Sequence, residues 1–430
     1  MKIVIVGAGK VGVALTRHLA VENRVTVIDQ NPHLVENIIN IYDVMGVCGN
    51  GASYDVQKEA DVEQADLLIA TTSSDEINIL TCLVAKKMGV QHTIARIRSP
   101  EYCRQLRFMR SELGLSMAIN PEAATAREIA RVLRFPTAMK LESFSKGRLE
   151  LVEYRVAEHT ALDCTRLSEL YRNFKVRVLI CAVARQGETI IPSGDFTLRA
   201  GDKIYLTAAP RELEKFFRLL GVFRARASSV MIVGASKMCY YLASELLEMG
   251  MSVKIIDQNE QRCVEMSEKL PRALVIVGDG TDSELLSEEG ISQTDAFVAI
   301  TGLDEANILM ALSAAKQSGD CCKVVAKINR KSLLELVSTE SLIDSVVSTG
   351  AVTTELILQY IRAMKNASAS KVKTLHRIVD EKVEALEFSV TPDISFAGVP
   401  LRDLNLKRGL LLAGIVRQNG QIVIPSGNDV

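Results

Sequence analysis

The amino-acid sequence predicts an α/β protein with two Rossmann-like domains, each a doubly wound parallel sheet followed by a small α+β module. Two observations carry this prediction. Short runs rich in valine and isoleucine alternate with helical patterns, as parallel strands and their crossover helices do. The whole pattern then occurs a second time, because residues 3–31 return at 230–259 with the same ending, Ile-Asp-Gln-Asn.

Further correspondences show that the chain contains an internal duplication. Their order is the same in both halves, and the spacing drifts by only a few residues, which makes chance similarity a poor explanation. The matching pairs are 49–51 with 278–280, 70–80 with 299–309, and 95–97 with 326–328.

The elements of the first copy follow from the apolar pattern. Its strand runs are continuous rather than alternating, which predicts strands buried on both faces and covered by helices. We expect strands near 2–6, 24–29, 44–48, 66–71 and 93–97, and helices near 10–21, 32–40, 53–60 and 75–88. A further helix is predicted from 121 to 133. It either packs on a neighbouring domain or covers its own sheet.

A different sequence pattern follows each α/β copy. Residues 149–157 and 176–184 alternate as half-exposed strands do, and return strands are predicted at 189–191 and 203–206. The segment IIPSGDFTLRAGDKIYL is echoed by IVIPSGNDV at the end of the second half. The last module is therefore predicted to be truncated or to lack its closing strand. The predicted boundaries are 1–140, 141–226, 227–367 and 368–430.

Composition narrows the class of protein. The 430 residues have a formal net charge of −1, which gives no bulk reason to expect nucleic acid or an anionic membrane as a partner. The nine scattered cysteines contain no Cys-x-x-Cys, so no metal site is predicted. No apolar run approaches the ~18 residues of a membrane span. We expect a cytoplasmic protein with reduced cysteines.

The strongest site motif is G-x-G-x-x-G, directly after the first strand and before the first helix. In this context the first glycine permits a tight turn and the second lets the backbone approach a pyrophosphate. The third allows the helix to pack close to the strand, and the helix N-terminus favours the anion. The predicted contacts are Gly7, Ala8, Gly9, Lys10, Val11 and Gly12.

Asp29 ends the second strand, at the position where this motif requires an acid. Its carboxylate can accept both ribose hydroxyls and would repel a 2′-phosphate. NAD(H) or an adenosine nucleotide such as ATP or ADP is therefore favoured over NADP. The alternative is a Rossmann domain whose glycines serve packing alone.

Other first-copy residues are expected to converge on the same crevice, at the carboxyl ends of the strands. Polar residues after the fourth strand can bond ribose or phosphate, or they cap the following helix. The two arginines around Ile97 are interpreted as pointing to opposite faces, with one reaching the phosphates and the other lying at a surface or interface. The residues at the end of the third strand lie beside the adenosine or form a plain turn. These candidates are Thr71, Thr72, Ser73, Arg96, Arg98, Gly49 and Asn50.

The second copy has a degraded motif, because Ser236 and Cys239 replace the second and third glycines. A Cβ at the former hinders backbone approach, and a thiol at the latter pushes the helix from the sheet. The second copy is therefore interpreted either as a working second site or as a domain that serves only as a structural partner of the first. The candidate contacts are Gly234, Ala235, Ser236, Lys237, Met238, Asp257, Ile300, Thr301 and Lys327.

No catalytic constellation can be assembled from the sequence. A dehydrogenase needs a proton donor or acceptor near the nicotinamide, and none of the five histidines follows a strand end with a carboxylate partner. We therefore predict no enzymatic activity. An NAD-dependent oxidoreductase is the alternative, and a scaffold that binds no nucleotide is the third hypothesis.

Taken in order and duplicated, the motifs GAGKVG, IDQN, GNGAS, TTSSDEIN and ARIRSPEY resemble those of the TrkA-type potassium-uptake regulators. Each half is similar to an RCK (KTN) nucleotide-binding domain followed by a TrkA-C module. The resemblance implies a subunit that docks on the cytoplasmic face of a TrkH-type membrane potassium transporter. It further implies a homo-oligomeric ring, with four chains favoured, in which NAD(H), ATP or ADP alters the gate. The same resemblance implies the ligand contacts named above in both halves.

Overall fold

The computed structural model describes most of the chain. The described residues are 1–102, 105, 113–134, 140–144, 148–222, 227–319, 322–337, 343–366, 372–379, 382–388, 390, 398–404, 409–417, 419–425 and 429. They form two compact units. The first unit holds both α/β copies (Met1–Ala130 and Ser228–Leu358), and the second holds the two modules with their connections (Arg131–Ala227 and Gln359–Val430).

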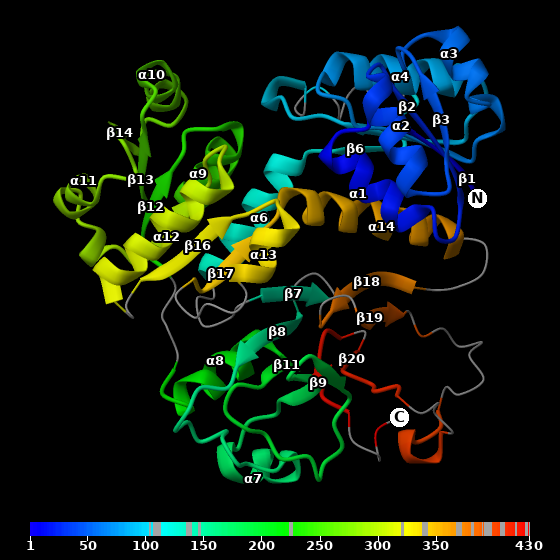
Figure 1. The fold of residues 1–430 in the computed structure, drawn as a ribbon. Helices are drawn as coiled ribbons and strands as arrows, with labels where there is room; N and C mark the ends of the chain where they lie inside the picture. The colour runs from blue at the N-terminus through cyan, green and yellow to red at the C-terminus, as the bar shows by residue number, and fades with distance from the viewer. Residues whose placement is uncertain are drawn as a thin grey trace. The chain divides into compact units, whose positions relative to one another are not determined.

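The first α/β copy is a six-stranded parallel sheet in the order β3-β2-β1-β4-β5-β6, with helices on both faces (Figure 1). Its inner strands β1 and β4 are almost wholly apolar and buried, as the continuous runs predict. The strands are β1 (Lys2–Val6), β2 (Arg24–Asp29), β3 (Met45–Cys48), β4 (Leu67–Ala70), β5 (His92–Arg96) and β6 (Met117–Ile119). The helices are α1 (Lys10–Leu19), α2 (Pro32–Ile41), α3 (Tyr54–Glu59), α4 (Asp75–Lys87) and α6 (Pro121–Arg134).

The second α/β copy repeats this topology, with the strand order β14-β13-β12-β15-β16-β17. The doubly wound fold of both copies is thereby confirmed. The strands are β12 (Ser229–Val233), β13 (Ser252–Asp257), β14 (Leu274–Val277), β15 (Ala296–Ala299), β16 (Lys323–Lys327) and β17 (Ser345–Val347). The helices are α9 (Lys237–Glu248), α10 (Glu260–Lys269), α11 (Ser283–Glu288), α12 (Asp304–Ser318), α13 (Lys331–Val337) and α14 (Thr349–Asn366).

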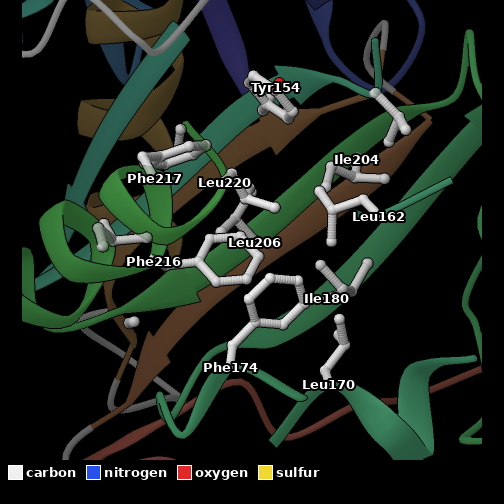
Figure 2. Close-up of a cluster of buried hydrophobic side chains, with 14 of the residues drawn as sticks. Tyr154, Leu162, Leu170, Phe174, Ile180, Ile204, Leu206, Phe216, Phe217 and Leu220 are labelled. Carbon is white, nitrogen blue, oxygen red and sulfur yellow. The ribbon is translucent and has the colours of Figure 1, made fainter. Parts of the chain in front are cut away.

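The first module is a five-stranded antiparallel sheet in the order β10-β9-β11-β8-β7. One face packs on α7 and α8, where Phe174, Phe216 and Phe217 form edge-to-face contacts around Leu206 (Figure 2). The elements are β7 (Lys140–Phe144), β8 (Leu149–Arg155), α7 (Leu170–Phe174), β9 (Leu179–Arg185), β10 (Glu188–Ile190), β11 (Lys203–Ala208) and α8 (Pro210–Leu219).

The described part of the second module contains two hairpins, β18 (Val372–Ile378) with β19 (Val383–Phe388), and β20 (Ile415–Val416) with β21 (Ile422–Val423). In the first module β11 lies between β8 and β9 and joins them into one sheet. Val383, Val416 and Ile422 of the second module pack against a core that covers the other face of the first module's sheet.

Two strands of the first half, β6 and β7, were not predicted, and each has a physical reason. β6 and β7 lie at sheet edges, and β6 has only three residues, without the β-branched run that marked the others. The helix expected at 121–133 is α6, and its apolar positions Ala124, Ile129 and Val132 are buried within the single chain. No helix among the described residues is long and apolar enough to cross a membrane.

Candidate functional site

The first glycine loop connects β1 to α1 and has the geometry of a phosphate-binding turn. Gly7 has φ +104°, and a Cβ there would come within 2.9 Å of the backbone of Thr71 and Thr72. A Cβ at Gly12 would overlap the carbonyl oxygen of Gly7, so this position requires glycine. A Cβ at Gly9 would meet no protein atom within 4 Å, which leaves space for a ligand beside the exposed Gly9 and Lys10.

Helix α1 begins at this loop with Gly9 as its N-cap, and Gly9 provides no side-chain cap. The N–H groups of a first helical turn have no partner inside the helix, and they and the dipole favour an anion. Glycine cannot occupy those donors with a side chain of its own. The loop therefore fits a pyrophosphate.

Asp29 is held against the same loop. Its Oδ2 accepts from the Ala8 N–H at 2.6 Å, and its Oδ1 accepts from the Asn31 N–H at 2.8 Å. Each carboxylate oxygen can accept a further hydrogen bond, so both remain suited to ribose hydroxyls. Gly49 lies at the end of the neighbouring strand and donates to the Asp29 carbonyl at 2.9 Å. Asn50 forms a turn, in which its Oδ1 accepts from the Ala52 N–H.

The loop after β4 lies directly beside Gly7. Thr71 is buried and its hydroxyl donates to the carbonyls of Val6 and Gly7. The Thr72 hydroxyl donates to Asn78 Oδ1 at 2.8 Å and to the Ser74 carbonyl. The cap of α4 is Ser74, one residue beyond the predicted set, whose oxygen accepts from the Ile77 N–H.

Arg96 and Arg98 contact the same loop, so their predicted placement on opposite faces is wrong. The Arg96 guanidinium donates to the Thr72 carbonyl at 3.5 Å, and the Arg98 guanidinium donates to the Ser73 carbonyl. Residues two apart on a strand share a face, and β5 ends at Arg96. Arg96 also pairs with Glu122 at 3.5 Å, yet its Nε has no hydrogen-bond partner among the described residues.

The second loop differs in ways that the replaced glycines explain. Ser236 is the N-cap of α9, and its hydroxyl oxygen accepts from the Cys239 N–H at 3.4 Å, which occupies one helix N-terminal donor. The Cys239 side chain is buried where Gly12 stands in the first copy. Ile300 replaces Thr71, and the Gly234 carbonyl accepts from the Ser236 N–H at 3.0 Å. The second loop therefore differs from the first in the N–H donors and the side chains that an anion would contact.

The other second-copy candidates keep the framework of the first. Asp257 Oδ2 accepts from the Ala235 N–H at 2.6 Å, and the Thr301 hydroxyl donates to Asn307 Oδ1 at 2.7 Å. Lys327 Nζ donates to the Ile300 carbonyl at 3.3 Å. Burial lowers the pKa of Lys327, while the nearby Asp304 and Glu122 raise it. Lys237 is exposed and Met238 buried.

Asn78 and Asn307 are framework residues that the sequence reasoning missed. Asn78 is fully buried, and its amide donates to the carbonyls of Thr72 and Arg96, tying the ends of β4 and β5 together. Asn307 makes the same bonds to Thr301 and Lys327 in the second copy. The repeated Asp-Glu-x-Asn in the two halves was the available signal. In the described part of the chain, no group of His, Cys, Asp and Glu side chains is arranged to hold a metal.

Fold and loop together define a tandem protein of the Rossmann type with a glycine-rich turn between the first strand and the first helix. Family models give the particular assignment: the TrkA-N domain matches residues 3–121 and 230–349, and the TrkA-C domain matches residues 151–221. The chain belongs to the TrkA family of potassium uptake proteins. This family is regulatory and non-enzymatic, so the oxidoreductase alternative does not hold.

Relatives in several organisms are similar over nearly their whole length. The Trk system potassium uptake protein TrkA homolog 1 of Methanosarcina mazei is 32% identical over 436 residues, which cover 100% of this chain and 94% of the relative. TrkA of Vibrio alginolyticus is 32% identical over 422 residues, covering 97% and 91%.

Solved structures share the fold. The GsuK channel aligns with a TM-score of 0.66 at 20% identity, over 100% of this chain and 74% of that one. A GsuK channel bound to NAD aligns with a TM-score of 0.63 at 20% identity, over 85% and 64%. A GsuK structure bound to ADP aligns with a TM-score of 0.53 at 16% identity, over 84% and 69%.

Proposed function

We propose that the chain is a nucleotide-sensing regulatory subunit that binds NAD(H), and also ATP or ADP, and gates a TrkH-type potassium transporter by a change of conformation. The observation that carries the proposal is the first loop, where Asp29 bonds the Ala8 N–H and the space at Gly9 is open. The names of the relatives and the nucleotides bound to GsuK support it.

The start of α1, Asp29 and Arg96 each have a distinct role in this proposal. The backbone N–H groups at the start of α1 bind the pyrophosphate. Asp29 accepts the ribose hydroxyls and disfavours a 2′-phosphate. Arg96 provides a fixed positive charge, because burial and its contacts with Thr72 and Glu122 hold the guanidinium in place.

The proposed partner is a TrkH-type membrane protein, on whose cytoplasmic face a homo-oligomeric ring of these chains docks, with four chains favoured. A nucleotide can shift such a ring only through its difference in affinity for two states. A tenfold difference supplies about 1.4 kcal/mol per site. Several sites in one ring add their contributions.

The test is calorimetric titration of the purified chain with NADH, NAD, ATP, ADP and NADPH, with stoichiometry as a second result. We expect NADH or ATP to bind and NADPH to bind much more weakly. Absence of binding by all five would remove the proposed function.

Asp29→Ala should weaken NADH binding about tenfold or more, because charged acceptors to the ribose are lost. Asp257→Ala, the matched change in the second copy, should leave the first site intact and shows by stoichiometry whether the second site binds. Unchanged affinity in Asp29→Ala would exclude Asp29 from the site.

A further inference from the structure

A hydroxyl group of the second α/β copy reaches the turn that follows β5 in the first copy. Tyr241 lies on α9, one helical turn after Lys237, and its hydroxyl donates to the backbone carbonyl of Arg98 at 3.1 Å. The same oxygen accepts from the side-chain amide of Asn120 at 2.8 Å. These groups are partly buried, so the bonds are partly shielded from water.

The turn at Arg98 holds one wall of the first candidate site. The N–H groups of Arg98 and Ser99 both donate to Asp75 Oδ2, at 2.9 and 2.8 Å. The Arg98 guanidinium donates to the Ser73 carbonyl. Ser73 and Asp75 therefore have their positions fixed by this turn, and they belong to the segment whose backbone packs against Gly7. These contacts connect the turn to the segment that packs against Gly7.

The residues at the corresponding positions of the two copies cannot form the same bond in reverse. The position of Tyr241 on α9 corresponds to Ala14 on α1, which has no hydroxyl. The counterpart of Arg98 is Asn329, and its side-chain oxygen accepts from the Thr349 N–H at 3.1 Å, within the second copy itself. The first copy therefore receives a tyrosine hydroxyl from the second copy, and Ala14 cannot provide the same bond to Asn329.

We propose that Tyr241 is a positioning residue of the first nucleotide site, contributed by the second α/β copy. This inference rests on the proposed nucleotide binding. The Tyr241 hydroxyl holds the Arg98 turn, and the turn holds Ser73 and Asp75 against the phosphate loop. The second copy, whose own loop carries Ser236 and Cys239, acts in this way on the affinity of the first.

The test compares Tyr241→Phe with Tyr240→Phe, in an Asp257→Ala background so that the first site is measured. Tyr240 is the matched control, because it is the adjacent tyrosine on α9, with ring centroids 5.5 Å apart, and the change removes the same group. By calorimetry with NADH, we expect Tyr241→Phe to bind about fivefold more weakly, the factor expected for one ordinary hydrogen bond. Tyr240→Phe should bind as the parent does.

Amide hydrogen exchange of the nucleotide-free protein provides a second readout that does not depend on binding. The Arg98 and Ser99 amides should exchange faster in Tyr241→Phe and remain unchanged in Tyr240→Phe. Equal affinity of the two variants would overturn the proposal, whatever the exchange shows. Unchanged exchange at Arg98 and Ser99 would overturn it as well. If no variant binds nucleotide, the proposed function itself fails, while the exchange still decides whether Tyr241 holds the turn.

Discussion

At the scale of single residues, the three glycines of the first loop are required for different reasons. Gly12 has no room for a Cβ because the Gly7 carbonyl lies directly against it, whereas Gly9 has open space. Sequence reasoning identified both positions, but it could not show that the protein itself excludes a side chain at Gly12 and leaves room for one at Gly9. The predicted damage from Ser236 at the second position therefore concerns the ligand, and it stays a prediction.

The second copy suggests how a side chain at the Gly12 position is accommodated. Cys239 stands there, and Ile300 replaces the threonine whose hydroxyl bonds the loop carbonyl in the first copy. We predict that Gly12→Cys destabilises the protein by about 1–3 kcal/mol through overpacking. Adding Thr71→Ile should recover part of that loss, because the Gly7 carbonyl loses its bond to the Thr71 hydroxyl and can shift, as the Gly234 carbonyl instead accepts from the Ser236 N–H.

The measurement is a double-mutant cycle by thermal unfolding, with Gly9→Ala as the control that adds a Cβ in open space. The Gly9 variant should lose less stability than Gly12→Cys, because its Cβ meets no protein atom and only the N-cap preference for glycine over alanine is lost. Strictly additive effects of Gly12→Cys and Thr71→Ile would show that the two positions are independent.

At the scale of elements, the sequence located the strands and helices of the first copy to within one or two residues at most ends. β1, β2 and the start of α4 follow directly from the apolar runs and from Asp75. The contacts between elements could not be predicted. The contacts of Arg96 and Arg98 with the β4–α4 loop, and those of the buried Asn78, depend on how β4 and β5 lie side by side, which a one-dimensional pattern does not contain.

The matching helices α4 and α12 differ in their caps, and this difference predicts a stabilising change. Ser74 caps α4, whereas exposed Leu303 occupies the N-cap of α12 in extended conformation and makes no side-chain cap. Leu303→Ser should stabilise the second copy by about 1 kcal/mol. Calorimetric melting would show a raised unfolding temperature. Leu303→Ala is the control, since it removes the same side chain without adding an oxygen, and an equal gain there would exclude capping as the cause.

Strand β8 of the first module carries a buried carboxyl group with a pH-dependent contribution to stability. Burial raises the pKa of Glu150 above its ordinary value of 4.5, while Arg134, 3.1 Å away, lowers it. The folded state therefore binds this proton more tightly than the unfolded state. The stabilisation is complete below the ordinary pKa and is lost as pH rises through the raised one.

Glu150→Gln should accordingly be more stable than the parent at pH 7 and nearly equal to it at pH 4. The amide oxygen still accepts from Arg134 and carries no charge to desolvate. Urea unfolding at the two pH values measures the difference, with the exposed Glu188→Gln as control. If Glu150→Gln is instead less stable than the parent at pH 7, the ion pair outweighs the cost of burial.

At the scale of the whole molecule, duplication was the most productive inference from sequence, because it predicted two sheets of identical order before any contact was known. The modules were harder to predict. Their sheet is assembled from strands distant in sequence, and β11 enters between β8 and β9 only in the folded chain. Neither the pairing of Phe216 with Phe174 nor the core shared with Val383, Val416 and Ile422 is visible as a local pattern.

If the chain forms the proposed ring, exposed apolar side chains at equivalent positions of the two copies are candidates for the contacts between chains. Leu80 on α4 and Leu309 on α12 occupy matching positions and are 45% and 65% exposed in the single chain. If chains associate through these helices, Leu80→Lys with Leu309→Lys should reduce the mass found by light scattering from that of a ring to that of a smaller species. The reason is that an unpaired ammonium group buried in an apolar contact is strongly unfavourable.

Val21→Lys is the control, because Val21 is 82% exposed and lies in the loop after α1. An unchanged mass in the double variant would place the ring contacts on other elements, whereas a reduced mass with intact NADH binding would separate assembly from nucleotide recognition.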